Sequence, residues 1–384
     1  MAEKKEKVQS VGKIDLEKMR NIVNKKAGLN VAVNLEDEDP SKVLEWVSTG
    51  STWLDNIIAQ GQVGGIPVGR ISMIAGASSS GKSFMAGIIA ANAQKQGLDV
   101  VYFDTEATMD AEFMQKLGCD TNRILYIQPT NVEMIFETIE QLITMTDNKL
   151  FFIWDSYANT PTKLDIEGTF NPNETMALKP RIVAKACQKL TIPLSQKQAT
   201  LLIINQLKTN LTADPKYAKY NEKYNAPGGM TLKYALSLSA WIFPTGNKES
   251  YILDENGYIV GYEMKVKLEK SKFGTTHREC FYKIMTSGQR LGVCDNESLF
   301  KALSDLSSSK FVRGGAWYTL KYDDGTEKKF QSKDWDELMT QPAFRQQVLK
   351  VAREELIDKF ANKEGNANQF YNIENLPEPQ IAED

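Results

Sequence analysis

The sequence has little of the chemistry that a histidine- or cysteine-based site needs. Its 384 residues include one histidine, His277, and four cysteines without a CxxC spacing, Cys119, Cys187, Cys280 and Cys294. A single histidine disfavours a histidine-based catalytic triad. Widely separated cysteines argue against a structural zinc site or a disulfide framework and predict thiols in a reducing compartment.

Long apolar runs are absent as well. Runs such as "LFFIW" and "TLLII" have the length of a strand, whereas a membrane span takes about 20 apolar residues. The first ten residues are polar and charged, with no apolar segment behind them, unlike a secretory signal. The net charge of −3 argues against indiscriminate coating of nucleic acid, so a basic surface must be local. We expect a cytoplasmic protein with no membrane partner.

Residues 41–290 alternate strand-sized apolar runs with helical stretches, which predicts an α/β core. Four runs, at 70–76, 99–106, 150–156 and 200–206, show no polar alternation, as is typical of strands buried on both faces of a parallel sheet. The helical stretches between them make βαβ units. Three later runs, at 240–246, 261–272 and 280–288, lack long helices between them and predict an antiparallel extension of the same sheet.

The two ends of the chain have a different character. Residues 1–40 predict a charged helical arm and an acidic linker that ends at Pro40. The apolar stripe of the arm helix either packs on its own domain or docks on a neighbouring subunit. Residues 291–365 predict a small α+β domain with a hairpin turning at Asp324-Gly325. Residues 366–384 are acidic, without lysine or arginine, and we expect them to be disordered.

The first strand ends in a phosphate-binding sequence. "GASSSGKS" fits G-x-x-x-x-G-K-[ST] in full, and its members are Gly76, Ala77, Ser78, Ser79, Ser80, Gly81, Lys82 and Ser83. The glycines allow a tight loop whose N–H groups face phosphates. Lys82 is predicted to meet the terminal phosphates and Ser83 to ligate Mg²⁺ at a helix N-terminus. A strand before and a helix after make a chance match improbable, so ATP and Mg²⁺ are the expected cofactors.

The other three strands also end in polar residues, at the sheet edge where ligands collect in open parallel sheets. Asp155 ends the third strand and suits Mg²⁺ binding through Ser83 and water. Glu106, two residues after Asp104, is a candidate general base for the water that attacks the γ-phosphate. Gln206 ends the fourth and is placed to sense that phosphate. The competing interpretations are a cap of the next turn for Asp155, a cap or a salt bridge for Glu106, and an ordinary strand-end glutamine for Gln206.

A basic and aromatic stretch, "KYAKYNEKYNAPGG" (216–229), follows that fourth strand and shows no helical or strand face to bury. Lysines neutralise backbone phosphates, and tyrosines stack on bases for about 1–3 kcal/mol each. The pattern favours a single-stranded nucleic acid loop, with a solvated surface loop as the alternative.

Taken in order, these motifs resemble the RecA-family recombinases over roughly residues 43–320. The resemblance rests on "VSTGSTWLD", the phosphate loop, "YFDTEATMD", "DSYANTPTKLDIEG", "IINQLK", "PGGMTLKYALSL", "VKLEKSK" and "GGAWY". The segment 334–358 looks more like the UvsX recombinases of tailed phages, and this likeness implies a phage-encoded member acting in the bacterial cytoplasm. The family resemblance implies helical filaments that form on single-stranded DNA and hydrolyse ATP. These filaments are expected to pair with homologous duplex DNA and exchange strands. Single-strand-binding and mediator proteins are the expected partners.

The resemblance also implies residue roles. It gives Lys82, Ser83, Asp155, Glu106 and Gln206 the roles argued above. Asp110 and Phe113 match adenine contacts, although the family often has tyrosine at the second position. Lys270 and Lys272 match a pair that reaches the neighbouring subunit's ATP.

Two DNA-binding loops are implied, at 166–181 and 207–229. In the first, Met176 matches an apolar wedge and Arg181 a phosphate contact; the loop is one residue longer than the common bacterial pattern. In the second, Lys208 matches a phosphate contact and Leu211 an apolar wedge. The basic and aromatic stretch adds the further expected contacts Lys216, Tyr217, Lys219, Tyr220, Lys223, Gly228 and Gly229. Asn210 replaces a basic residue of the family pattern there.

Three other functions fit parts of the sequence. A hexameric helicase or motor shares the fold but is expected to carry an arginine finger instead of the Lys270/Lys272 pair. A small-molecule P-loop kinase leaves the Lys/Tyr loop unexplained. A scaffold that binds ATP without hydrolysis does not require Glu106.

Overall fold

The computed structural model describes residues 15–28, 30–37, 39–59, 64–107, 109–168, 177–209, 224–245, 250–274, 276–288, 291–306 and 308–356. The chain forms two compact units, Met1–Leu44 and Glu45–Asp384. The larger unit contains all of the predicted strands that the structure describes, and the smaller contains the predicted arm helix.

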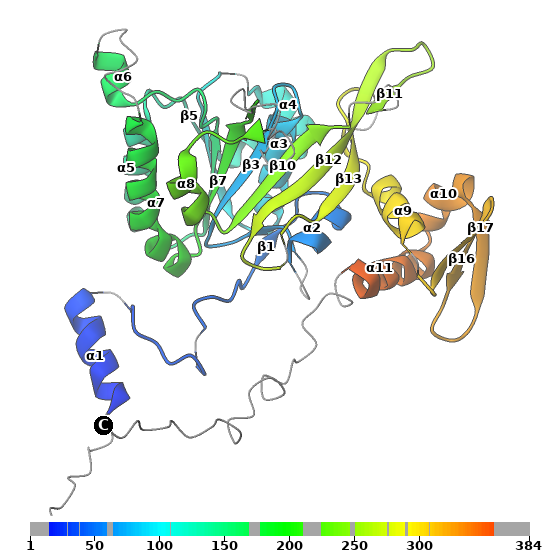
Figure 1. The fold of residues 1–384 in the computed structure, drawn as a ribbon, viewed down its shortest axis with the longest axis horizontal. Helices are drawn as coiled ribbons and strands as arrows, with labels where there is room; N and C mark the ends of the chain where they lie inside the picture. Colours follow the sequence, from blue (N-terminus) through cyan, green and yellow to red (C-terminus); the bar gives the residue numbers. More distant parts are fainter. Residues whose placement is uncertain are drawn as a thin grey trace, which may run out of the picture. The chain divides into compact units, whose positions relative to one another are not determined.

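The larger unit is built on a ten-stranded sheet in the order β14-β13-β12-β10-β3-β7-β6-β4-β5, with β11 paired to β12 (Figure 1). The strands are β3 (Ile71–Gly76), β4 (Asp99–Asp104), β5 (Ile124–Ile127), β6 (Leu150–Asp155), β7 (Thr200–Gln206), β10 (Leu238–Pro244), β11 (Tyr251–Leu253), β12 (Ile259–Ser271), β13 (Glu279–Met285) and β14 (Gly292–Val293). Neighbours are parallel from β10 to β5 and antiparallel from β10 to β14. The predicted mainly parallel α/β sheet is confirmed.

One strand differs from the prediction. The run at 240–246 was expected to extend the sheet in antiparallel fashion, but β10 is parallel to β3, with Leu238 beside Ser72 and Ile242 beside Gly76. The reason is the helix α8 (Gly229–Ala235), which returns the chain across the sheet before β10 begins. Among the described strands, β11, β12, β13 and β14 form the antiparallel extension.

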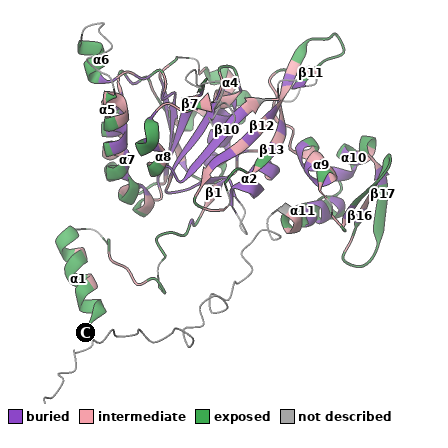
Figure 2. Ribbon diagram, in the orientation of Figure 1, coloured by how far each residue is buried: buried purple, intermediate pink, exposed green. Residues whose placement is uncertain are grey.

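Helices cover both faces of the parallel strands. Ile74 and Val100 pack in one apolar cluster with α3, whereas Met73 and Val101 pack in a second with α5 and α7. Successive strand residues point to opposite faces, so continuous apolar runs fill both layers, and Figure 2 shows the central strands as buried. The helices of this part are α2 (Thr52–Ile58), α3 (Lys82–Lys95), α4 (Ala111–Lys116), η1 (Thr121–Arg123), α5 (Val132–Met145), α6 (Lys163–Glu167) and α7 (Leu178–Gln196). Of the helices described, none is long and apolar enough to cross a membrane.

The C-terminal part of the larger unit has its own three-stranded sheet, and the predicted hairpin at Asp324-Gly325 is confirmed between β16 and β17. Its elements are α9 (Asp295–Asp305), β15 (Phe311–Gly314), β16 (Trp317–Lys321), β17 (Glu327–Gln331), η3 (Ser332–Asp334), α10 (Trp335–Met339) and α11 (Pro342–Leu356). The predicted helical stretch 334–360 is divided at Thr340–Gln341, before Pro342, because proline has no N–H to continue a helix. The acidic tail 366–384 lies outside the described residues.

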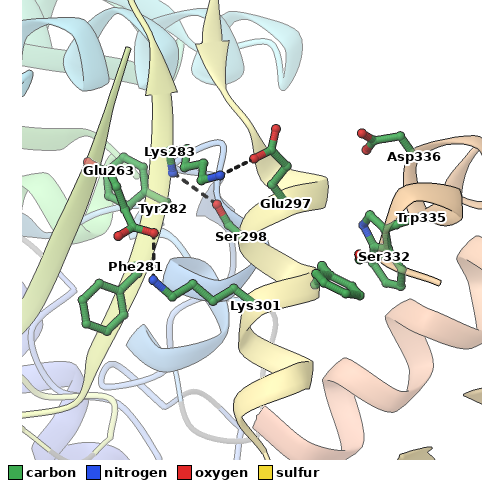
Figure 3. A pocket seen from close by; sticks show the side chains of 11 residues that line it. Glu263, Phe281, Tyr282, Lys283, Glu297, Ser298, Lys301, Ser332, Trp335 and Asp336 are labelled. Carbon is green, nitrogen blue, oxygen red and sulfur yellow. Dashed lines mark hydrogen bonds and ion pairs between the residues drawn. The ribbon is translucent and has the colours of Figure 1, made fainter. Parts of the chain in front are cut away.

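A hollow of about 360 Å³ lies where this C-terminal part meets β12 and β13 (Figure 3). Two ion pairs cross one side of it: Lys283 to Glu297 at 2.6 Å and Lys301 to Glu263 at 2.7 Å. Trp335 faces them from the other side. A second junction lies nearby, where the Asp295 carboxylate accepts 2.6 Å hydrogen bonds from the Thr52 N–H and hydroxyl and so joins α9 to α2.

The "VSTGSTWLD" motif folds around one buried carboxylate. Asp55 accepts hydrogen bonds from the Ser48 hydroxyl and from the N–H and hydroxyl of Thr49. Burial raises the pKa of Asp55 to about 7, although these bonds act in the opposite direction. The motif is therefore structural: it shapes the chain that leads into α2.

The smaller unit contains one helix within its described residues. Helix α1 (Leu16–Ala27) confirms the predicted arm helix, with Asp15 as its N-cap and Gly28 in the left-handed conformation at its end. The Asn24 side chain bonds to both N–H and C=O of Ala32, which holds the following extended segment against the helix. None of the helix residues is buried, and its apolar side chains Leu16 and Ile22 are about two-thirds exposed.

Two short ribbons complete the described structure. β1 (Trp46–Val47) pairs with β2 (Ile66–Pro67), and β8 (Lys208–Thr209) pairs with β9 (Tyr224–Asn225). The second ribbon joins the two ends of the 207–229 loop immediately after β7.

Candidate functional site

The phosphate loop joins β3 to the 14-residue helix α3. Gly76 has no room for a side chain, since a Cβ there would lie 2.4 Å from the Ser80 hydroxyl oxygen and 2.8 Å from the Ile242 carbonyl oxygen. Gly81 adopts φ +74° at the N-cap of α3, a conformation that favours glycine. The helix therefore begins at Lys82 with its positive end toward the loop, as phosphate binding requires.

The loop lines a cavity of about 420 Å³ at the carboxyl ends of the strands. Its lining residues are Ser78, Ser79, Ser80, Gly81, Lys82, Ser83, Phe84, Glu106, Asp155, Ser156, Asn159 and Gln206. The sequence-predicted phosphate, metal, base and sensor residues are therefore brought together. Ser80 contributes a buried hydroxyl that has no hydrogen-bond partner among the described residues. This hydroxyl can therefore form a hydrogen bond with a ligand.

The charged side chains that line the cavity are one cation, Lys82, and two carboxylates, Glu106 and Asp155. Lys82 donates to the Ala77 carbonyl at 2.7 Å within the loop; burial lowers its pKa, while Asp155 and Glu106 act in the opposite direction. Burial raises the pKa of Asp155, and hydrogen bonds from Ser83 and Tyr102 oppose that shift. Within the described residues no three His, Cys, Asp or Glu side chains gather as a metal centre. A Mg²⁺ ion here would accordingly need oxygen ligands from phosphates and water besides Ser83 and Asp155.

Glu106 is held by two donors on one oxygen. The Ser156 hydroxyl lies 2.8 Å and the Asn159 amide 2.6 Å from Glu106 Oε1. Asp104, which shares its strand end, plays a structural part instead, because it accepts from the N–H groups of Glu106 and Met109 and so shapes the turn after β4. Ser156 and Asn159 were not predicted as site residues; the run "SYANT" directly after Asp155 was the available signal.

Gln206 lies beside Gly76 in the parallel register of β7 and β3, at the edge of the cavity. The preceding residue, Asn205, was not predicted as a site residue, because one polar residue in an otherwise apolar strand does not reveal its hydrogen-bond partner. Its side chain is fully buried and donates to the Pro227 carbonyl at 2.8 Å. Asn205 thus ties the nucleotide edge of the sheet to the far end of the 207–229 loop.

The described ends of that loop form its neck. Lys208 pairs with Asn225 in the ribbon of β8 and β9, and its side chain is exposed. Tyr224 is half-buried and lies 5.2 Å from the Phe243 ring, so it packs on the core. Gly228 has φ +118° at the N-cap of α8, and a Cβ there would come within 2.4 Å of Leu232, while Gly229 follows with φ +67°. Both glycines have a backbone role in starting α8.

The predicted contact residues Arg181, Asp110 and Phe113 lie at the starts of α7 and α4. Arg181 is exposed in the first turn of α7. Asp110 caps α4 by accepting from the N–H groups of Glu112 and Phe113, and the Phe113 ring lies 5.5 Å from that of Phe84. Neither Asp110 nor Phe113 is among the described residues that line the cavity. The predictions for Met176, Leu211, Lys216, Tyr217, Lys219, Tyr220 and Lys223 lie outside the described residues.

Lys270 and Lys272 lie toward the opposite edge of the sheet from the phosphate loop. β12 is antiparallel to β10, so its last residues pair with the start of β10: Lys270 with Ser239 and Ser271 with Leu238. Lys270 donates to the carbonyls of Lys233 and Tyr234 at the end of α8, and Lys272 is exposed. Burial lowers the pKa of Lys270 to about 8, with Lys272 and Lys233 adding to the shift. The fold does not bring this pair to the phosphate loop of its own chain.

Comparison with known proteins agrees with this geometry. Residues 14–289 match the family model described as the RecA N-terminal domain. The Protein RecA of Streptomyces avermitilis is 30% identical over 83% of this chain and 79% of its own length. That of Mannheimia haemolytica is 30% identical over 83% of each, and that of Streptomyces venezuelae 31% identical over 82% of this chain and 77% of its own length. The chain belongs to the RecA family.

Proposed function

We propose that the protein is an ATP-dependent DNA recombinase that forms filaments on single-stranded DNA and promotes homologous pairing and strand exchange with duplex DNA. It is a RecA-type recombinase and a DNA-dependent ATPase. The observation that carries the proposal is the shared edge of the sheet: the phosphate loop, Glu106 and Gln206 line one cavity, and the neck of the 207–229 loop begins at the next residues.

The residue roles are part of this proposal. Lys82 neutralises the terminal phosphates, and Ser83 and Asp155 hold Mg²⁺. Glu106 orients and deprotonates the attacking water, and Gln206 senses the γ-phosphate. Phosphoryl transfer needs positioning and charge stabilisation more than covalent chemistry, which this polar cavity supplies. Asp110 and Phe113 contact adenine. At the DNA loops, Met176 and Leu211 are apolar wedges and Arg181 and Lys208 meet phosphates.

The placement of Lys270 and Lys272 supports assembly into a filament. Since they lie toward the edge opposite the phosphate loop, they complete a nucleotide site only in another copy. A contact between two different faces of identical chains is heterologous, and repeating it gives an open helix unless it closes into a ring. We assign the exposed apolar side chains of α1 to the same assembly, with the arm 1–40 docking on the adjacent subunit.

Several finer assignments belong to this proposal as well. We place the chain in the phage UvsX branch on the resemblance of segment 334–358, with the cytoplasm of an infected bacterium as its setting. Single-strand-binding and mediator proteins are the expected partners. We divide the chain into an oligomerisation arm (1–40), an ATPase core (41–290), a small C-terminal domain (291–365) and an acidic tail (366–384).

The central test is ATP turnover with and without single-stranded DNA, combined with electron microscopy in the presence of an ATP analogue. We expect turnover to rise on adding DNA and helical filaments to appear, with Lys82→Ala inactive in both assays. Rings would support a hexameric motor, and monomers with DNA-independent phosphotransfer a kinase. Nucleotide binding without phosphate release would indicate a scaffold. Turnover indifferent to DNA contradicts the proposal.

The basic stretch gives a separate prediction. Changing Lys216, Lys219 and Lys223 together to glutamine should weaken binding to single-stranded DNA and reduce the slope of log affinity against log salt by about 2, because each phosphate contact in a single strand contributes about 0.7. Binding of a fluorescent oligonucleotide across a salt series measures it. The matched control changes three lysines near the opposite edge of the sheet, Lys95, Lys149 and Lys197. An unaltered slope in the first variant would identify 216–223 as a surface loop.

A further inference from the structure

Lys179 is a lysine that the site described above does not use. It lies in the first turn of α7, at the end of the predicted DNA loop 166–181. Its ammonium nitrogen is 4.5 Å from the centre of the Tyr157 ring and donates to the Ala158 carbonyl at 3.2 Å. The side chain therefore points inward, onto the turn that follows β6, although surface lysines usually extend into water.

The same turn, residues 156–159, also holds Glu106. Ser156 and Asn159, its first and last residues, are the two donors to Glu106 Oε1. Hydrogen bonds order this turn: the Ser156 carbonyl accepts from the Thr160 hydroxyl, and the Tyr157 N–H donates to the Ile204 carbonyl. Tyr157 is buried against Trp154, with ring centres 5.4 Å apart. A short, ordered element thus contacts both Lys179 and Glu106.

We propose that Lys179 is a positioning residue for Glu106, acting through the turn 156–159, and that it transmits the state of the 166–181 loop to the nucleotide site. The inference rests on the proposed role of Glu106 as general base. Lys179 is fixed in α7, so a change in the loop that moves the start of this helix moves its ammonium over Tyr157 and Ala158. The turn then shifts Ser156 and Asn159, and an error of about 1 Å in a catalytic group costs up to 10²-fold in rate.

The first test is Lys179→Met, which keeps the length of the side chain and removes its charge. We expect kcat at saturating single-stranded DNA to fall about tenfold, with the KM for ATP and the affinity for DNA little changed. Lys179→Arg should restore most of the activity, because a guanidinium also lies on an aromatic ring and donates to a carbonyl. Asn159→Ala, at an exposed position, should give the same defect, and the double variant should lose less than the product of the single losses.

Other outcomes overturn the inference. A weaker DNA affinity with unchanged kcat would make Lys179 a phosphate contact. If the double variant lost activity by the full product of the two single losses, Lys179 and Asn159 would act independently. Equal loss of the DNA-free and the DNA-stimulated rate would reduce Lys179 to a structural residue. Failure of the proposed function is distinguishable, since wild-type turnover would then not respond to DNA at all.

A pH profile adds a readout that a structural role would not change. Burial lowers the pKa of Lys179 to about 8; Asp165 from α6 acts against this shift and Lys208 from β8 adds to it. The charged form is therefore lost as pH rises from 7 to 9, and DNA-stimulated kcat should fall over this range. Lys270 titrates there too, so the diagnostic quantity is the difference from Lys179→Arg, whose guanidinium stays charged. Identical profiles for the two proteins contradict the inference.

Discussion

Glu106→Gln should reduce DNA-stimulated ATP turnover by about 10²–10⁴-fold, the usual contribution of a general base. Glutamine keeps the size of the side chain, and its carbonyl oxygen can still accept from Ser156 and Asn159, but it cannot take a proton from water. ATP binding should persist, so the variant should form filaments that do not turn over. Phosphate release and nucleotide affinity, measured on the same preparation, separate the two effects.

The matched control is Glu112→Gln, at an exposed carboxylate whose only ion pair in the described structure is with Lys116 on the same helix. Such surface pairs contribute little, and turnover should stay close to that of the wild type. A Glu106→Gln variant with the wild-type rate would show that Glu106 is not the general base. The proposed role of Lys179 would then lose its basis.

Trp335→Ala should destabilise the C-terminal part by about 3–5 kcal/mol, the usual cost of removing a buried aromatic side chain. Trp335 is 3% exposed, and its indole N–H donates to the Asn296 carbonyl at 2.8 Å. Four phenylalanine rings lie within 6.0 Å of its own, and they are Phe300, Phe311, Phe330 and Phe344. A loss of this size is a large fraction of the stability of a small domain.

The measurement is limited proteolysis at increasing denaturant concentration, followed by nucleotide binding. Early cleavage beyond residue 290 with nucleotide binding retained is expected, and it would support a separate domain at 291–365. Trp317→Ala is the control within the same sheet: its side chain is 43% exposed, and its loss should cost within about 0.5 kcal/mol. Loss of the whole larger unit at one denaturant concentration would show that the boundary at 290 does not separate independent folding units.

The sequence predicted those parts of the molecule that depend on local pattern. Continuous apolar runs defined the parallel strands, and the phosphate loop was recognised because glycine spacing, strand and helix coincide. The direction of β10 was not predictable from its composition, since a parallel and an antiparallel strand with both faces buried look alike. Asn205, Ser156 and Asn159 were missed because their importance lies in contacts across the fold. Asp104 and Asp110 show the reverse: their carboxylates fix backbone N–H groups, which a residue type alone does not reveal.

The position of Lys270 has a consequence for how hydrolysis depends on assembly. If each nucleotide site takes its lysines from the next copy along, a row of n copies contains n − 1 complete sites, and one end always carries a site that lacks them. A free monomer would then bind ATP but scarcely consume it. Turnover per molecule would rise with filament length and fall sharply on dilution. ATP would therefore be consumed where DNA has already gathered the protein. The terminal subunit would differ chemically from all the others.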